Sequence, residues 1–141
     1  AAAANFVPLC GGEETPEAGL EACEARLGSL RRPFDAVVLG MGEDGHFASL
    51  FPGVDDLAAL LAQNAPLLAA TRPAAAAHAR ITFSLAALQN ARNLVLQITG
   101  ERKRAVLEAA AEQGANELEL PVAALLRQTR APLRVFFSPI E

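Results

Sequence analysis

The chain has 141 residues, 52% of them hydrophobic, and a formal net charge of −4 at pH 7. This acidic balance argues against a nucleic-acid partner, which requires a basic surface, and the sequence has no apolar run of about 18 residues that would span a membrane. We therefore expect one domain, residues 1–141, with enough apolar content to bury a hydrophobic core.

Predicted helices and strands alternate along the chain. The first helix is expected to begin at Pro16, because Thr15 suits the N-cap and proline suits the first helical position, and to end near Leu30. Further helices are predicted over 57–63, 86–92, 103–113 and 122–128, and apolar strands over 34–39, 66–71, 81–85, 93–99 and 133–138, with a surface loop over 72–79. This alternation predicts an α/β fold whose sheet is mostly parallel and covered by helices on both faces.

A glycine-rich turn follows the first predicted strand. It runs from Gly40 to Gly53 with the sequence GMGEDGHFASLFPG, and it sets Asp44 and His46 close together. Glycines let the backbone turn sharply and approach a ligand, and an open α/β sheet binds its ligands where its strands end. We expect the chemistry of this protein to be located in this turn.

His46 is the candidate catalytic residue of the turn. A neutral imidazole can take a proton from water as a general base and return one to a leaving oxygen. Asp44 is expected to hold the ring in the tautomer that leaves one nitrogen unprotonated, with an Asx turn as the alternative role. The other histidine, His78, lies in the alanine-rich loop with no acid nearby in the sequence and is expected to be a solvated surface residue.

Two glycines of the turn are candidate substrate-binding positions. Gly42 and Gly45 are expected to leave backbone N–H groups accessible, and such groups can stabilise the oxyanion of a tetrahedral intermediate. Turn geometry alone is the alternative reason for a glycine at either position.

The turn resembles the active-site motif of the glucosamine-6-phosphate isomerase/6-phosphogluconolactonase family, in its lactonase branch. Four more segments fit the same family in order along nearly the whole chain: 15–17, 80–83 with Leu85 and Leu88, 99–107 and 131–137. The resemblance implies the three-layer fold shared with glucosamine-6-phosphate deaminase and ribose-5-phosphate isomerase. It also implies hydrolysis of 6-phosphoglucono-δ-lactone to 6-phosphogluconate, in the pentose phosphate pathway.

The resemblance further implies where the phosphate of the substrate binds. Arg80 and Lys103 match the family's basic residues on that side, and Arg offers phosphate a planar fork while Lys offers a point charge. The plainer alternatives are a solvated residue at a strand end for Arg80 and an ordinary first-turn helical residue for Lys103.

The family's domain is longer than this chain, and we expect the chain to be its C-terminal portion. The family's N-terminal part supplies a glycine- and Ser/Thr-rich loop for the phosphate, and nothing here matches that loop. We therefore expect the isolated 141 residues to turn over the lactone poorly. The sequence leaves the oligomeric state open.

Two alternatives to the lactonase remain. The glucosamine-6-phosphate-type isomerase/deaminases share the motif up to Asp-Gly-His but carry a proton-relaying Glu before their Pro, where this chain has Phe51 before Pro52. A non-catalytic sugar-phosphate-binding module is the second alternative, and the presence of both Asp44 and His46 argues against it. Phe47, where many relatives carry Thr, is expected to pack in the interior.

The remaining chemistry-bearing residues point to a simple cytoplasmic enzyme. Cys10 and Cys23 have no metal-ligand spacing and are expected to be free thiols in a reducing compartment. The sequence shows neither a metal-binding cluster nor a nucleophile elbow, so we expect no metal and no cofactor. The expected partner is a small phosphorylated sugar lactone.

Overall fold

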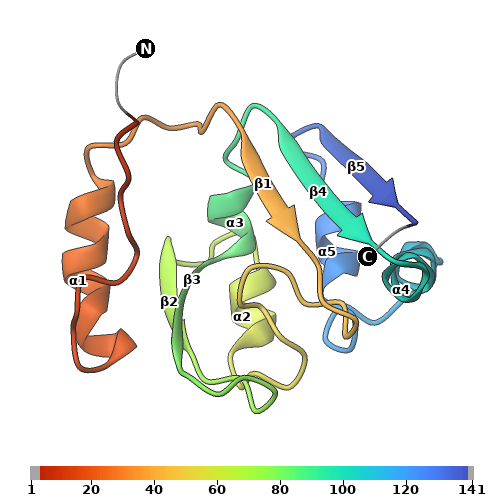
Figure 1. Ribbon diagram of the computed structural model, residues 1–141, viewed down its shortest axis with the longest axis horizontal. Coiled ribbons are helices and arrows are strands. Elements are labelled where there is room, and N and C mark those ends of the chain that lie inside the picture. The colour runs from red at the N-terminus through yellow and green to blue at the C-terminus, as the bar shows by residue number, and fades with distance from the viewer. Residues whose placement is uncertain (1–3, 140–141) are drawn as a thin grey trace.

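The computed structural model describes residues 4–139 and shows helices and strands in alternation (Figure 1). The helices are α1 (Pro16–Leu27), α2 (Leu57–Leu61), α3 (Leu85–Leu88), α4 (Glu101–Ala111) and α5 (Val122–Arg127). The strands are β1 (Val37–Gly40), β2 (Leu68–Thr71), β3 (Arg80–Phe83), β4 (Leu94–Thr99) and β5 (Leu133–Ser138). None of these helices has the length and apolar character needed to cross a membrane.

Three strands form a parallel sheet in the order β1-β4-β5. Val37 lies opposite Leu94, and Leu94 lies opposite Leu133, so β4 is paired along both of its edges. The three arrows run the same way in Figure 1, and their carboxyl ends meet at one edge of the sheet. That edge is where an open α/β sheet places its ligands.

One face of this sheet carries the main hydrophobic core. Side chains alternate between the two faces of a strand, and on β4 the buried residues are Leu94, Leu96 and Ile98. They pack against buried leucines of α2 and α3 and against Val122 and Leu125 of α5, among others. The opposite face is open, with Val38 67% exposed and Phe136 56% exposed. Within the described residues, the helical cover predicted for both faces is thus found on one.

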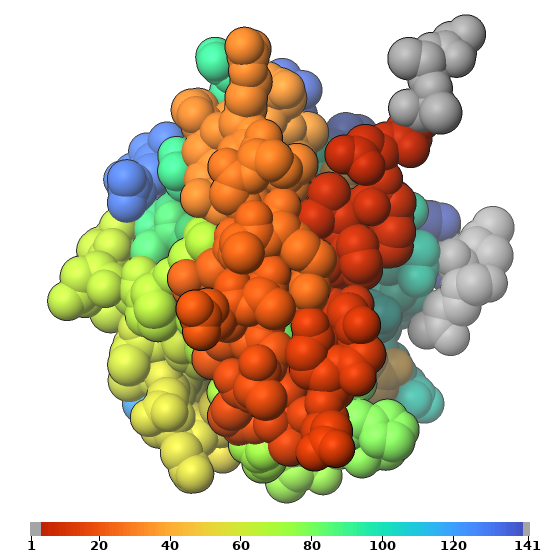
Figure 2. Space-filling model, turned by 90° about the vertical axis from the view of Figure 1, so that its left-hand side faces the viewer, coloured from red at the N-terminus to blue at the C-terminus, as the bar shows by residue number. Residues whose placement is uncertain are grey.

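β2 and β3 form a separate antiparallel pair. Leu68 lies opposite Phe83, and Thr71 opposite Arg80. This pair packs against α1 through a second core cluster, which contains Cys23, Leu27, Leu68 and Ile81. Figure 2 shows the outer side of this part, where the red N-terminal segment lies along the orange-red α1. β2 and β3 are therefore not part of the parallel sheet.

All the predicted helices and strands are present, with shifts at their ends. Thr15 caps α1 as predicted, since its hydroxyl accepts the N–H of Ala18 at 3.2 Å. The predicted strand 81–85 ends earlier, because Ser84 caps α3 by accepting the N–H of Ala87. That cap starts the helix at Leu85. A side-chain cap of this kind pairs a backbone N–H of the first turn and so favours that helix start.

Glu13 and Arg26 tie the N-terminal segment to α1. Glu13 accepts the N–H of Gly11 at 2.6 Å and a guanidinium N–H of Arg26 at 3.0 Å. Arg26 also donates to the backbone carbonyls of Pro8 and Leu9. Hydrogen bonds from the backbone of Glu13 itself and of Gly11, and then from Arg26, lower the pKa of the Glu13 carboxyl to about 2.

We expect this attachment to resist acid. A carboxyl whose folded pKa is depressed contributes stability above its ordinary pKa of 4.5 and loses that contribution as pH falls through about 2. In an NMR titration, the Glu13 carboxyl carbon should therefore change near pH 2, and Arg26→Gln should move its midpoint upward. A midpoint near 4.5 in the unmodified protein would show that the carboxyl is not held by these donors.

Candidate active site

The glycine-rich turn begins where β1 ends and folds back on itself. Gly42 donates its N–H to the His46 carbonyl at 2.9 Å, and Gly45 donates to the Gly42 carbonyl at 3.1 Å. Met41 pairs with Phe47 in a short antiparallel bridge. These bonds hold the short loop between Gly42 and His46 at the carboxyl end of the parallel sheet.

Asp44 and His46 form a hydrogen-bonded dyad in this loop. The His46 Nδ1 lies 2.6 Å from the Asp44 Oδ1, and the same oxygen accepts the His46 backbone N–H at 3.2 Å. An ionised carboxylate only accepts hydrogen bonds, so it favours the tautomer with the proton on Nδ1. Nε2 is then the nitrogen free to accept a proton. Asp44 therefore makes both the contact predicted for orienting the ring and the backbone contact of an Asx turn.

The Asp44 carboxyl stays ionised at neutral pH. Burial is the largest single influence and raises its pKa. The hydrogen bonds from the His46 ring and backbone, together with the attraction to that ring, outweigh burial and leave the pKa below its ordinary value of 3.8. Asp44 is thus available as an acceptor for the imidazole over the whole range in which a histidine can act as a base.

Glycine is required at position 42 because a side chain there would collide with the dyad, and not because its N–H must be free to bind a ligand. A Cβ at Gly42 would lie 2.2 Å from the His46 Nδ1 and 2.5 Å from the Asp44 Oδ1, far inside van der Waals contact. The expectation that the N–H groups of Gly42 and Gly45 are accessible is wrong, because both donate to carbonyls within the turn. The physical reason is that so tight a turn satisfies its own backbone donors.

Gly45 is fixed by a segment distant in the sequence. Its carbonyl accepts the N–H of Val122 at 2.9 Å, its φ is +77°, and a Cβ there would lie 3.1 Å from the Leu120 Cδ2. The N-terminal end of α5 therefore supports the turn. No pattern in the turn itself indicates this contact.

Phe51 places an aromatic ring against the dyad. Its ring stacks on the His46 imidazole with a centroid distance of 3.8 Å and an interplanar angle of 19°. The Arg80 Cζ lies 5.8 Å from the centroid of the same Phe51 ring. Arg80, at the start of β3, is thus brought next to the histidine turn.

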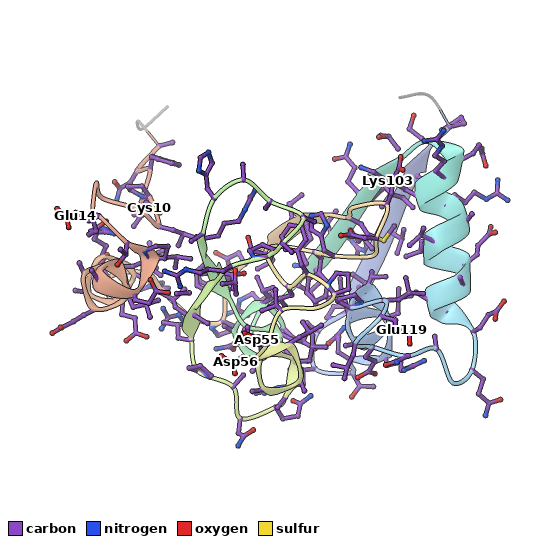
Figure 3. All side chains as sticks on the ribbon, turned by 90° about the horizontal axis from the view of Figure 1, so that it is seen from below. Cys10, Glu14, Asp55, Asp56, Lys103 and Glu119 are labelled. Carbon is purple, nitrogen blue, oxygen red and sulfur yellow. The ribbon has the colours of Figure 1, made fainter. Side chains whose placement is uncertain are left out.

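Lys103 shares a pocket with His46. The pocket has a volume of about 440 Å³ and is lined by Lys103, His46, Ala48 and the residues from Val38 to Gly42. In Figure 3, Lys103 lies at the start of α4 beside the loop that follows β1. The adjacent Arg102 lies 3.7 Å from Glu43, and both of these side chains are largely exposed. The structure therefore brings a cation and the dyad to one opening.

The other predictions for this region concern packing. Phe47 is fully buried, as predicted, and His78 is exposed in its loop, as predicted. Cys10 and Cys23 are free thiols. Sequence reasoning missed Ala48, which adopts a left-handed φ of +50° within the motif. An alanine in this conformation is uncommon and marks a backbone held by its surroundings.

Comparison with known proteins gives the family. The family model for glucosamine-6-phosphate isomerases/6-phosphogluconolactonase matches residues 1–134. The chain belongs to this family. It is 44% identical to the 6-phosphogluconolactonase of Rhizobium meliloti (strain 1021), over 99% of this chain and 60% of that protein. It is 39% identical to the 6-phosphogluconolactonase of Mesorhizobium japonicum, over 99% of this chain and 58% of that protein.

The predicted fold class is confirmed by solved structures of the same family. The crystal structure of a 6-phosphogluconolactonase from Shewanella baltica OS155 matches with a TM-score of 0.85 and 41% identity, covering 92% of this chain and 55% of that one. A monomeric glucosamine-6-phosphate deaminase, 17% identical with a TM-score of 0.60, shares the fold. The chain spans about 60% of the length of the curated relatives it matches.

Proposed function

We propose that this protein hydrolyses 6-phosphoglucono-δ-lactone to 6-phosphogluconate in the cytoplasm, as a step of the pentose phosphate pathway, with His46 as the general base. The observation that carries the proposal is the 2.6 Å contact between the His46 Nδ1 and Asp44, which leaves Nε2 as the free ring nitrogen. Membership of the family and its relatives named 6-phosphogluconolactonase support this substrate.

The proposed reaction uses one water and returns every proton. The Nε2 of His46 takes a proton from water while the water oxygen adds to the lactone carbonyl carbon. Asp44 stabilises the imidazolium that forms. When the tetrahedral intermediate collapses, the bond between the carbonyl carbon and the ring oxygen breaks. The Nε2 proton then passes to the leaving ring oxygen, which gives the open acid and restores neutral His46.

Lys103 and Arg80 are proposed to bind the phosphate. Lys103 lines the same pocket as His46, and Arg80 lies on the Phe51 ring that stacks on His46. Both side chains are cations, and a phosphate dianion is attracted to them. Gly42 and Gly45 are proposed to shape the site through the backbone path of the turn, since their amides are already bonded.

A direct assay tests the proposed function. The protein is given 6-phosphoglucono-δ-lactone, and acid release is followed with the spontaneous hydrolysis subtracted. Glucosamine 6-phosphate is given in parallel, and ammonia release is measured. Lactone hydrolysis without ammonia release supports the proposal. Ammonia release would indicate the deaminase alternative, which Phe51 disfavours because a phenyl ring relays no proton. A thermal shift with 6-phosphogluconate and no turnover would indicate a binding module.

Neutralising either cation is expected to weaken binding of the phosphorylated substrate selectively. A hydrogen bond to a charged group contributes about 1.5–3 kcal/mol, so Arg80→Gln and Lys103→Gln should each raise KM for 6-phosphoglucono-δ-lactone about tenfold or more. Unphosphorylated gluconolactone should be affected much less. Arg130→Gln, at an exposed residue outside the pocket, serves as the control. Equal losses on both lactones would place the phosphate elsewhere.

A further inference from the structure

We infer that Phe51 is a positioning residue that fixes the plane of His46 and the place of Arg80 at the same time. It would thereby set the spacing between the base and the phosphate of the substrate. The inference rests on the proposed function. It goes beyond that function by assigning a role to a residue that has no proton to give and no charge.

The turn is built so that Phe51 returns over His46. The chain reverses direction between Phe47 and Leu50, where Leu50 donates its N–H to the Phe47 carbonyl at 3.0 Å. Ala48 adopts its left-handed φ of +50° inside this reversal. A left-handed conformation is unfavourable for a non-glycine residue, because its Cβ comes too close to the following carbonyl oxygen. The fold therefore maintains an unfavourable backbone conformation at the point that brings the phenyl ring back to the imidazole.

The imidazole is held from three sides. Asp44 holds its Nδ1 at 2.6 Å. The α-carbon of Gly42 closes the edge formed by Nδ1 and Cε1, since a Cβ there would lie 2.2 Å and 2.3 Å from these atoms. Phe51 covers a face of the ring at 3.8 Å. The Nε2 edge is left for the water, and only Phe51 of the three prevents the ring plane from tilting about the Asp44 contact.

Phe51 is a rigid support because it is itself buried. The residue is 6% exposed, so the packing around its ring restricts how far that ring can follow the imidazole. With the two centroids 3.8 Å apart and the rings 19° from parallel, the imidazole lies face to face with the phenyl ring. When His46 takes its proton, the face of the phenyl ring also attracts the cation that forms. The same contact therefore orients the neutral base and stabilises its protonated form.

Arg80 lies on the same phenyl ring. Its Cζ is 5.8 Å from the Phe51 centroid, within the range of a cation–π interaction. Arg80 is otherwise an exposed side chain at the start of β3, and a long exposed side chain is not held in one place by its own backbone. Because His46 and Arg80 both rest on one buried ring, the distance between the base and the guanidinium is set by Phe51.

The test compares three substitutions at this position. Phe51→Leu and Phe51→Met keep an apolar side chain of similar size but remove the flat face, whereas Phe51→Tyr keeps it. A misplaced reacting group can cost on the order of a hundredfold in rate. We expect Leu and Met to lower kcat about tenfold or more on both phosphorylated and unphosphorylated lactone. They should also raise KM for the phosphorylated lactone alone. Phe51→Tyr should keep both kcat and KM close to those of the unmodified protein.

A spectroscopic readout separates positioning from loss of fold. The proton in the short bond between His46 and Asp44 should give a low-field NMR resonance, which we expect to broaden or disappear in Phe51→Leu and to persist in Phe51→Tyr. Phe83→Leu is the control, since Phe83 makes its edge-on contact with Phe34 instead. If Phe51→Leu does not fold, the same NMR measurement is made on Phe51→Met.

The outcomes distinguish the inference from the proposed function. An unchanged low-field resonance and an unchanged preference for the phosphorylated lactone in folded Phe51→Leu or Phe51→Met would overturn the inference. No hydrolysis of either lactone above the spontaneous rate, even at high protein concentration, would instead overturn the proposed function. The low-field resonance would still report whether Phe51 orders the dyad.

Discussion

Replacing His46 with alanine is expected to lower kcat for lactone hydrolysis by about a hundred- to ten-thousand-fold, the usual contribution of a general base. The fold should be retained, because the His46 side chain is 28% exposed and lies on a surface turn. The change is measured as kcat on 6-phosphoglucono-δ-lactone after subtraction of spontaneous hydrolysis. The free energy of unfolding is measured alongside by denaturant titration.

His78→Ala is the matched control for this experiment. It removes the other histidine of the chain, which is exposed in its loop, and should leave kcat unchanged. Adding imidazole to His46→Ala should recover part of the lost rate, because a free base can enter the space that the ring vacates. Hydrolysis by His46→Ala close to that of the unmodified protein would exclude His46 as the base.

The sequence indicates the catalytic turn well because the turn is local. An apolar strand, four glycines, Asp44 and His46 lie together within residues 34–53. The contact between Asp44 and His46 spans only two residues. Contacts of such short range are determined largely by the conformation of the turn itself, so the residue types and their spacing are enough to predict them.

Contacts of long range in the sequence were not predictable in the same way. Gly45 is hydrogen-bonded to Val122, and Arg80 reaches the Phe51 ring from β3. Both contacts depend on how the layers pack, and neither leaves a periodic signal in the sequence. The hydrogen bond of the Gly42 N–H inside the turn was missed for a different reason. A glycine whose N–H is free and one whose N–H is hydrogen-bonded look the same in a sequence.

The antiparallel pairing of β2 and β3 is indicated by the length of the loop between them, and not by their hydrophobic pattern. Parallel strands need a crossover of a dozen or more residues, whereas antiparallel strands can be joined by a short connection. The predicted loop over 72–79 is shorter than such a crossover, which favours the antiparallel pairing that the structure shows. Loop length therefore distinguishes the two kinds of pairing where the apolar character of both strands does not.

The uncovered face of the parallel sheet lies beside the pocket of the dyad. Val38 is 67% exposed on this face, and it also lines the pocket that contains His46 and Lys103. A base is most effective when water is excluded from the charges around it. Covering this face would therefore also exclude water from the pocket of the dyad, and we expect it to raise kcat.

Gly42→Ala is expected to abolish the geometry of the dyad while leaving both of its residues in place. The new Cβ would lie 2.2 Å from the His46 Nδ1 and 2.5 Å from the Asp44 Oδ1. Contacts this short do not occur, so something must move. The atoms in the way are the ends of two side chains on a surface turn, whereas the Gly42 backbone is held by its bond to the His46 carbonyl. The ring and the carboxylate should therefore separate.

The expected result is a loss of kcat on the order of a hundredfold, as for other small displacements of a reacting group. The free energy of unfolding should fall by about 1 kcal/mol, as for a typical point substitution. The low-field resonance of the bond between His46 and Asp44 should disappear. Gly28→Ala is the control, because a Cβ there meets the carbonyl oxygens of Ala25 at 3.3 Å and Glu24 at 3.6 Å and lies at the end of α1. Full activity with the resonance intact in Gly42→Ala would show that the turn can open to admit a methyl group without disturbing the dyad. Glycine at position 42 would then be needed only for the backbone conformation of the turn.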